Sequence, residues 1–198
     1  MSAPSAIALP RHAVLADALP GARVRDAALI LGGALLTALF AQVSIHVPGS
    51  PVPITGQTLA VVLTAAALGP VRGVAVQALY IACALVGLPF YSEASGGVDV
   101  VLGATGGYVV GFIPAAYLIG LAARRGADRN PLKAVPLFIA GQAVIFAVGV
   151  PWLAVSTGMS ASQALDAGFY PFILGGIVKA AVASAVLGSA WALTRHRD

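Results

Sequence analysis

The chain has few charged residues for its length: 11 basic and 7 acidic side chains in 198 residues. Soluble domains of this size carry about a quarter charged residues, so this composition excludes an ordinary soluble domain. The single cysteine, Cys83, lies within an apolar run and cannot form an intramolecular disulfide. The three histidines, His12, His46 and His196, lie outside the apolar runs, so no metal framework is expected.

Sequence motifs for catalysis and for energy coupling are also missing. The chain contains no G-x-x-x-x-G-K-[ST], no H-E-x-x-H and no G-x-S-x-G segment. Its apolar runs hold no Asp or Glu of the kind that couples transport to protons or sodium. We therefore expect no enzyme activity, no metal and no cofactor, and any concentrative transport would need an outside energy source.

What the chain does contain is apolar sequence, at 59% hydrophobic residues with a mean hydropathy of +0.94. The runs lack the strict alternation of a β-barrel and suit helices, each needing about 20 residues to cross a bilayer. We predict an all-α, polytopic membrane protein with six transmembrane helices. The expected spans are residues 27–45, 57–68, 73–88, 106–123, 134–155 and 171–193. The second is short, so it is expected to be tilted or broken.

The basic residues predict the orientation of these spans, because Lys and Arg near span ends stay on the cytoplasmic side. Ten of the eleven basic residues fall on one side of the six-span arrangement. The opposite loops hold His46, Glu93, Asp99 and Asp166 instead. Both termini are therefore predicted to be cytoplasmic, with residues 1–25 and 195–198 as tails around a transmembrane domain at 26–194. The placement of basic residues on the cytoplasmic side accounts for their excess over acidic residues, so nucleic-acid binding is not needed to explain it.

Lys179 is the only ionisable residue deep inside an apolar run. A Lys at the centre of a membrane helix costs roughly 2.5 to 3.5 kcal/mol on insertion scales, and no acidic residue in a predicted span can neutralise it. One interpretation is that its long side chain snorkels to the outer surface. The other is that Lys179 binds an anionic ligand in a site open to the exterior.

Other polar residues are weaker candidates for the same site. Gln42 and Gln142 lie in predicted spans, where such groups commonly bond between helices at about 0.6 kcal/mol. In the outer loop, Phe90 and Tyr91 precede several glycines. That segment either caps a pocket or forms an interfacial aromatic belt. In the first span, Ala34-x-x-x-Ala38 permits close contact between helices, with internal packing as the default.

Several segments taken together resemble the BioY family, the biotin-binding S components of energy-coupling factor transporters. They are PVPITGQ, LGPVRG, GLPFY, GATGGYVVGF and PFILGGIVKAA, and the likeness extends over roughly residues 27–190. The resemblance implies a six-helix protein of the cell membrane. It further implies that the protein binds biotin from outside and works with a transmembrane T component and two ATPase subunits.

The resemblance also implies roles for individual residues. Lys179 matches the family's last-helix lysine, residues 90–95 match an outer-loop part of the site, and residues 53–55 match a lid. The face of Ala34 and Ala38 looks like the surface that meets the T component. In two places the chain departs from the family: it has Gly176 where an acidic residue is common, and Ala104 where Pro is common.

The function expected from these observations is biotin binding for ATP-driven uptake, with the lipid bilayer and the transporter's other subunits as partners. The expected ligand contacts are Lys179, Gln42, Thr55, Phe90, Tyr91, Ser92, Glu93, Tyr108 and Gln142. The alternative is a membrane scaffold or assembly protein without a small-molecule site, in which Lys179 snorkels or meets a partner's carboxylate. A membrane enzyme comes third, since no nucleophile and base pair is visible.

Overall fold

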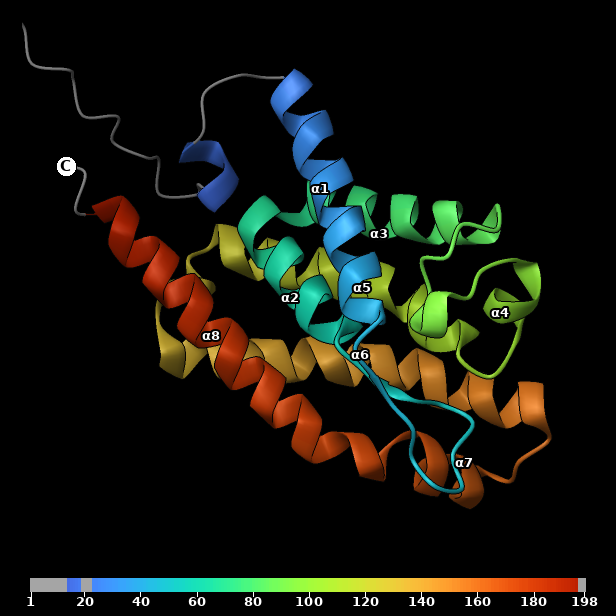
Figure 1. Ribbon diagram of the computed structural model, residues 1–198. Helices are drawn as coiled ribbons and strands as arrows, with labels where there is room; N and C mark the ends of the chain where they lie inside the picture. The colour runs from blue at the N-terminus through green and yellow to red at the C-terminus, as the bar shows by residue number, and fades with distance from the viewer. Residues whose placement is uncertain (1–13, 19–22, 196–198) are drawn as a thin grey trace, which may run out of the picture.

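The computed structural model describes residues 14–18 and 23–195, and these form a bundle of helices (Figure 1). The α-helices are α1 (Arg23–Ala41), α2 (Gln57–Leu68), α3 (Pro70–Leu85), α4 (Val98–Leu102), α5 (Gly106–Arg124), α6 (Pro131–Thr157), α7 (Ala161–Gly168) and α8 (Ile173–Arg195). Short 3-10 turns are η1 (Leu15–Ala18), η2 (Ser92–Ala94), η3 (Ala127–Arg129) and η4 (Tyr170–Phe172). The two strands are β1 (Ser44–Ile45) and β2 (Ile54–Thr55).

Four stretches of the described chain are long and apolar enough to cross a membrane: α1, α5, α6 and residues 161–194, which include α8. The other two predicted spans correspond to α2 and α3, which are apolar but have only 12 and 16 residues. At 1.5 Å per residue, α2 is about 18 Å long, short of a hydrocarbon core of about 30 Å. The structure is thus that of a helical membrane protein, and the count of six spans stays a prediction.

The first apolar run does not stay helical to residue 45, because its end enters a hairpin. Helix α1 stops at Ala41, and β1 pairs with β2 in antiparallel register, Ser44 opposite Thr55. We call residues 44–55 the outer hairpin. Its tip is tied to α7 by Ser50, whose hydroxyl contacts the main-chain carbonyl of Ala167 at 2.7 Å. This contact lies at the lower end of the molecule in Figure 1.

Helix α5 is the central helix, with 61% of its span buried, against 28% for α1. It packs against α2, α3 and α6. Glycine allows one of these close approaches: a Cβ on Gly120 would lie 2.5 Å from the main chain of Gly69 and Pro70, at the turn between α2 and α3. The small residues of α5 therefore let three helices surround it.

The face formed by Ala34 and Ala38 is covered by the chain itself. The two alanines are 1% and 8% exposed and belong to the main apolar core. Helix α1 packs on α2 and α3 along this side, where a Cβ on Gly33 would lie 2.7 Å from Val76. The expectation that these alanines meet a T component is therefore wrong for this structure, because α2 and α3 already fill the position of a partner.

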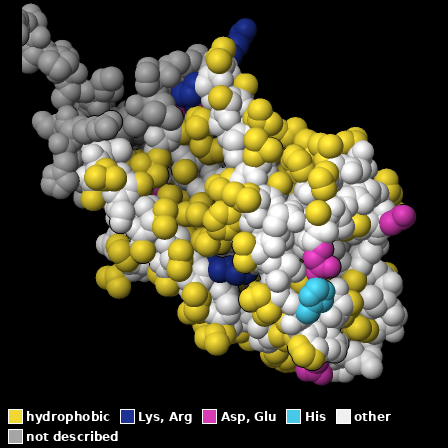
Figure 2. Space-filling model, in the orientation of Figure 1, with side chains coloured by type: hydrophobic (Ala, Val, Ile, Leu, Met, Phe, Trp, Pro, Cys, Tyr) yellow, Lys and Arg dark blue, Asp and Glu magenta, His cyan; other side chains and the backbone are white. Residues whose placement is uncertain are grey.

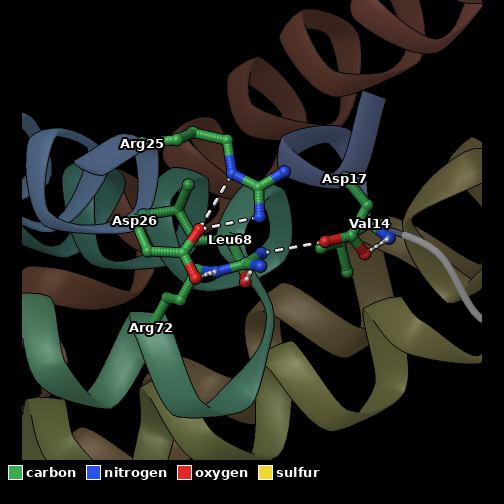
Figure 3. Close-up of polar contacts among 6 residues, drawn as sticks. All are labelled: Val14, Asp17, Arg25, Asp26, Leu68 and Arg72. Atoms are coloured by element: carbon green, nitrogen blue, oxygen red, sulfur yellow. Dashed lines mark hydrogen bonds and ion pairs between the residues drawn. The ribbon is translucent and has the colours of Figure 1, made fainter. Parts of the chain in front are cut away.

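An ion-pair cluster fixes the end of the bundle opposite the outer hairpin. Arg72 bonds Asp17 of η1 at 3.0 Å and Asp26 of α1 at 3.1 Å, and Arg25 bonds Asp26 at 2.8 Å (Figure 3). These contacts tie η1 and the start of α1 to α3. In Figure 1 the start of α1 and the end of α8 both lie at the upper end.

Apolar side chains cover much of the surface seen in Figure 2, while acidic and histidine side chains show at its lower right. The exposed large residues of α1 and α8 include Leu31, Leu35, Leu174 and Val178. Exposed apolar helix faces of this extent are unstable in water and suit contact with lipid.

Candidate ligand-binding site

A pocket lies among α2, α5, α6, α8 and the outer hairpin. Its empty space is about 640 Å³ when the mouth is included. The outer hairpin forms part of its wall. Its lining is Val52, Pro53, Thr55, Gln57, Thr58, Tyr91, Ser92, Thr105, Tyr108, Val109, Phe112, Gln142, Ile145, Phe146, Phe172 and Lys179.

Lys179 supplies the only cationic side chain in this lining. Its ammonium donates hydrogen bonds to the main-chain carbonyl of Thr55 at 2.6 Å and to the hydroxyl of Thr58 at 3.0 Å. An ammonium has three donors, so one is left after these two bonds. Among the described residues, no carboxylate forms an ion pair with it. The positive charge is thus hydrogen-bonded but not neutralised, which suits an anionic ligand.

Gln142 lies on another wall of the pocket, where α6 meets α8. Its side-chain amide nitrogen donates to the main-chain carbonyl of Gly176 at 2.8 Å, and the residue is 5% exposed. Tyr108 on α5 uses its hydroxyl to donate to the carbonyl of Gly168 at 2.9 Å. Both side chains line the pocket while bonding the main chain of the segment from α7 to α8.

Aromatic rings form much of the remaining wall. Phe146 contacts Tyr108 edge-on at 6.1 Å between ring centroids and packs at a tilt on Phe172 at 6.0 Å. Tyr91 meets Tyr80 edge-on at 5.5 Å. Burial raises the pKa of the Tyr91 hydroxyl to about 12, and this buried hydroxyl has no hydrogen-bond partner. Such walls favour a ligand with a flat or cyclic apolar body.

The segment joining α3 to α4 is fastened to the end of α1 by Gln42. The Gln42 amide nitrogen donates to the carbonyl of Tyr91 at 3.0 Å, and its oxygen accepts from the main-chain nitrogen of Ala94 at 2.9 Å. The next residues are strained, since Glu93 and Ala94 have φ values of 59° and 54°. Gln42 therefore holds Tyr91 in the pocket wall through the main chain.

Six of the nine expected contacts are brought together in the pocket lining: Lys179, Thr55, Tyr91, Ser92, Tyr108 and Gln142. The other three lie outside it, and each has another partner. Gln42 bonds the main chain as described, and Phe90 stacks on Tyr80 at 6.3 Å. Glu93 pairs with His46 at 2.9 Å on the exposed surface. Gln42 supports the wall through the main chain, and Phe90 and Glu93 are not part of this lining; contact of these three residues with a ligand stays a prediction.

The sequence analysis missed most of the apolar lining, including Phe112, Phe146 and Phe172, because an aromatic residue in an apolar span carries no mark of the side it faces. It also missed Gln57 and Thr58. Gln57 is the last residue of the quoted PVPITGQ segment and Thr58 follows it, so the polar start of the second span is the signal that could have found them. Within residues 14–18 and 23–195, no cluster of three or more His, Cys, Asp or Glu side chains is placed to hold a metal ion.

Comparison with known proteins gives relatives along nearly the whole chain. A probable biotin transporter BioY of Pyrococcus horikoshii is 34% identical over 161 residues, covering 81% of this chain and 93% of its own. The biotin transporter BioY of Thermotoga maritima is also 34% identical, over 158 residues, covering 80% and 92%. The one from Rhizobium etli is 33% identical over 171 residues, covering 79% and 90%.

A solved structure shares the fold. The crystal structure of the S-component for biotin from an ECF-type ABC transporter superposes with a TM-score of 0.74 at 24% identity, covering 86% of this chain and 94% of that one. The sequence matches the BioY family over residues 12–196. The chain belongs to the BioY family.

Proposed function

We propose that this protein is the biotin-binding S component of an energy-coupling factor transporter and that the pocket at Lys179 is its biotin site. The observation that carries the proposal is an ammonium without a counter-ion, set in a pocket whose other walls are largely apolar and aromatic. Relatives described as biotin transporters and the fold of a biotin S component support it.

Biotin has the chemistry that these walls select. Its fused rings and aliphatic chain suit the side chains of Ile145, Phe146 and Phe172, and its carboxylate suits the remaining donor of Lys179. Its cyclic urea needs polar groups, which Gln142 and the threonines at the start of α2 supply. A ligand lacking either the ring system or the carboxylate would leave one of these walls unused.

The lining of the pocket also assigns a role to the outer hairpin. Val52 and Pro53 of the hairpin line the pocket, and Thr55 of β2 bonds Lys179 directly. We infer that the outer hairpin moves away to admit biotin and closes over it, as a lid on the exterior side. A lid on the exterior side requires that the protein crosses the cell membrane six times with both termini in the cytoplasm.

No nucleotide-binding segment occurs in the chain. The proposed function therefore includes partners, a T component and ATPase subunits, which supply the energy for uptake. Accumulation of biotin in cells would then depend on those subunits, whereas binding to the purified chain would not.

The proposal is tested by titrating biotin into the purified protein in detergent and measuring heat and, in parallel, mass in native mass spectrometry. One biotin per chain is expected. Valerate, which has the carboxylate without the rings, serves as the matched ligand and is expected to bind far more weakly. If the folded protein binds neither ligand, the biotin site is rejected and the scaffold alternative is favoured.

The orientation is tested separately by labelling from outside intact cells. Cys83 is replaced by Ala, and a single cysteine is placed at Asp166 of α7 or at Lys133 of α6, both exposed positions. A membrane-impermeant maleimide is expected to label Asp166→Cys and to spare Lys133→Cys until the cells are opened. The reverse pattern would overturn the proposed orientation.

A further inference from the structure

The contact between Gln142 and Gly176 is unusually close and depends on the absence of a side chain. A Cβ built on Gly176 would lie 2.7 Å from the Oε1 atom of Gln142. The same amide donates through its Nε2 atom to the carbonyl of Gly176 at 2.8 Å. The Gln142 amide thus occupies the space that a side chain at position 176 would fill.

This contact also fixes which end of the amide is free. A main-chain carbonyl can only accept, so Nε2 must face Gly176, and the opposite orientation would bring two acceptors together. Among the described residues, no donor reaches Oε1. Gln142 is 5% exposed and lines the pocket. Oε1 is not among the fully enclosed polar atoms that lack a partner, so it is open to the pocket, where a ligand N–H can bond it.

From this geometry we propose that Gln142 Oε1 accepts a hydrogen bond from one N–H of the ligand's cyclic urea, and that Gly176 is the positioning residue that makes room for it. The inference rests on the proposed function and deepens it. Gln142 then selects ligands that carry an N–H at this point, and Gly176 acts only through Gln142.

The neutrality of this acceptor matters because Lys179 lies one helical turn from Gly176. Residues three apart on a helix share a face, so a carboxylate at position 176 would lie beside the ammonium. Such an internal ion pair would neutralise the charge that the ligand's carboxylate requires. An amide accepts the N–H without a charge, so Lys179 keeps its positive charge.

The test measures affinity for biotin and for two derivatives that each carry a methyl group on one urea nitrogen. The variant Gln142→Met keeps the volume and removes the acceptor. Gly176→Ala places a methyl group against Oε1. Gly175→Ala is the matched control, because it makes the same change one residue earlier, where the nearest atom to the new Cβ is Ile54 Cγ2 at 3.9 Å.

In the wild type, one of the two methylated ligands is expected to bind much more weakly than biotin. In Gln142→Met, biotin affinity falls about tenfold and the discrimination against that ligand shrinks by a similar factor, since the bond is already absent. Gly176→Ala shifts both quantities in the same direction, whereas Gly175→Ala leaves both at the wild-type values.

Equal weakening of all three ligands by Gln142→Met would overturn the inference, as would Gly176→Ala behaving like its control. If Gly176→Ala fails to fold, the ligand discrimination of Gln142→Met decides alone. A wild-type protein that binds no biotin would refute the proposed function itself, so the two failures are distinguishable.

Discussion

Lys179 of α8 donates a hydrogen bond to the main-chain carbonyl of Thr55 at 2.6 Å, which joins the last helix to the outer hairpin. The same ammonium bonds Thr58 at the start of α2. One charged group therefore contacts the lid, a neighbouring helix and the pocket at once. If the ligand's carboxylate bonds this ammonium as proposed, ligand binding and hairpin position are linked through Lys179.

The tip of the outer hairpin is also held by the Ser50 hydroxyl, and removal of this hydroxyl is predicted to make the hairpin open more often. In Ser50→Ala the contact between the Ser50 hydroxyl and the carbonyl of Ala167 is lost, together with the contacts of this hydroxyl to the main chain of Val52 within the hairpin. A neutral hydrogen bond contributes about 0.5 to 1.5 kcal/mol, so local opening of the hairpin becomes about 2- to 13-fold more frequent. Hydrogen exchange of the amides in residues 47–55 is expected to quicken, and biotin to dissociate faster.

The control for this variant is Ser162→Ala on α7, where the Ser162 hydroxyl contacts only Ser160. It is expected to leave exchange in the outer hairpin unchanged. If Ser50→Ala also leaves hairpin exchange and biotin dissociation unchanged, the contact to α7 does not restrain the lid.

Removing the hydroxyl of Tyr91 is predicted not to destabilise the protein. This buried hydroxyl has no hydrogen-bond partner among the described residues, and burial raises its pKa to about 12, so it stays protonated under ordinary conditions. Deleting an unsatisfied polar group while keeping the ring against Tyr80 leaves stability unchanged or raises it by up to about 1 kcal/mol. Thermal unfolding of Tyr91→Phe in detergent, without ligand, measures this. A marked fall in the melting temperature would mean that the hydroxyl has a partner after all.

The sequence predicts the helices well because hydrophobic runs in a membrane protein are interrupted by charge, Pro and Gly. The predicted second span and helix α2 have the same bounds, residues 57 and 68. The predicted first span extends too far, because Val43 and Ile45 continue the apolar run although α1 ends at Ala41 and the chain enters β1. Helix α7 lies in an expected loop, although Ser160 and Gln163 form a capping box that a search for S-x-x-Q would have marked.

The site is only partly predictable from sequence. Lys179 stands out because a charge in an apolar span has few structural explanations. The contact between Gln142 and Gly176 joins residues 34 positions apart on two helices, so neither span by itself indicates it. Likewise, Ala34 and Ala38 are buried because α2 and α3 pack against their face of α1. A pattern of small residues within one span fits a covered face as well as an exposed one.

Asp128, in the turn η3 between α5 and α6, is predicted to make stability depend on pH. Asp128 is 1% exposed, and one of its carboxylate oxygens accepts from Trp191 at 2.6 Å. The other oxygen has no hydrogen-bond partner within the part of the chain that the structure describes. Burial raises the pKa of this carboxyl above its usual 3.8. The folded state therefore holds the proton more tightly than the unfolded state, and stability falls as the pH rises from about 4 to the raised pKa.

Across that window, this one group removes up to about 1.4 kcal/mol of stability per pH unit. The variant Asp128→Asn keeps an acceptor for Trp191 but cannot ionise, so its stability is expected to lack this contribution. Chemical denaturation of both proteins at a series of pH values measures the difference. Parallel curves for wild type and variant would show that Asp128 does not titrate within the folded protein as described.

The proposed biotin site depends most on the charge of Lys179. Calorimetry tests this by measuring the affinity of the wild type and of Lys179→Ala, each for biotin and for the neutral biotin amide. A charge-assisted hydrogen bond contributes about 1.5 to 3 kcal/mol, so biotin affinity is predicted to fall about 10- to 150-fold in the variant. Affinity for the amide is predicted to fall far less. Equal losses for the two ligands would contradict the pairing of Lys179 with the ligand's carboxylate.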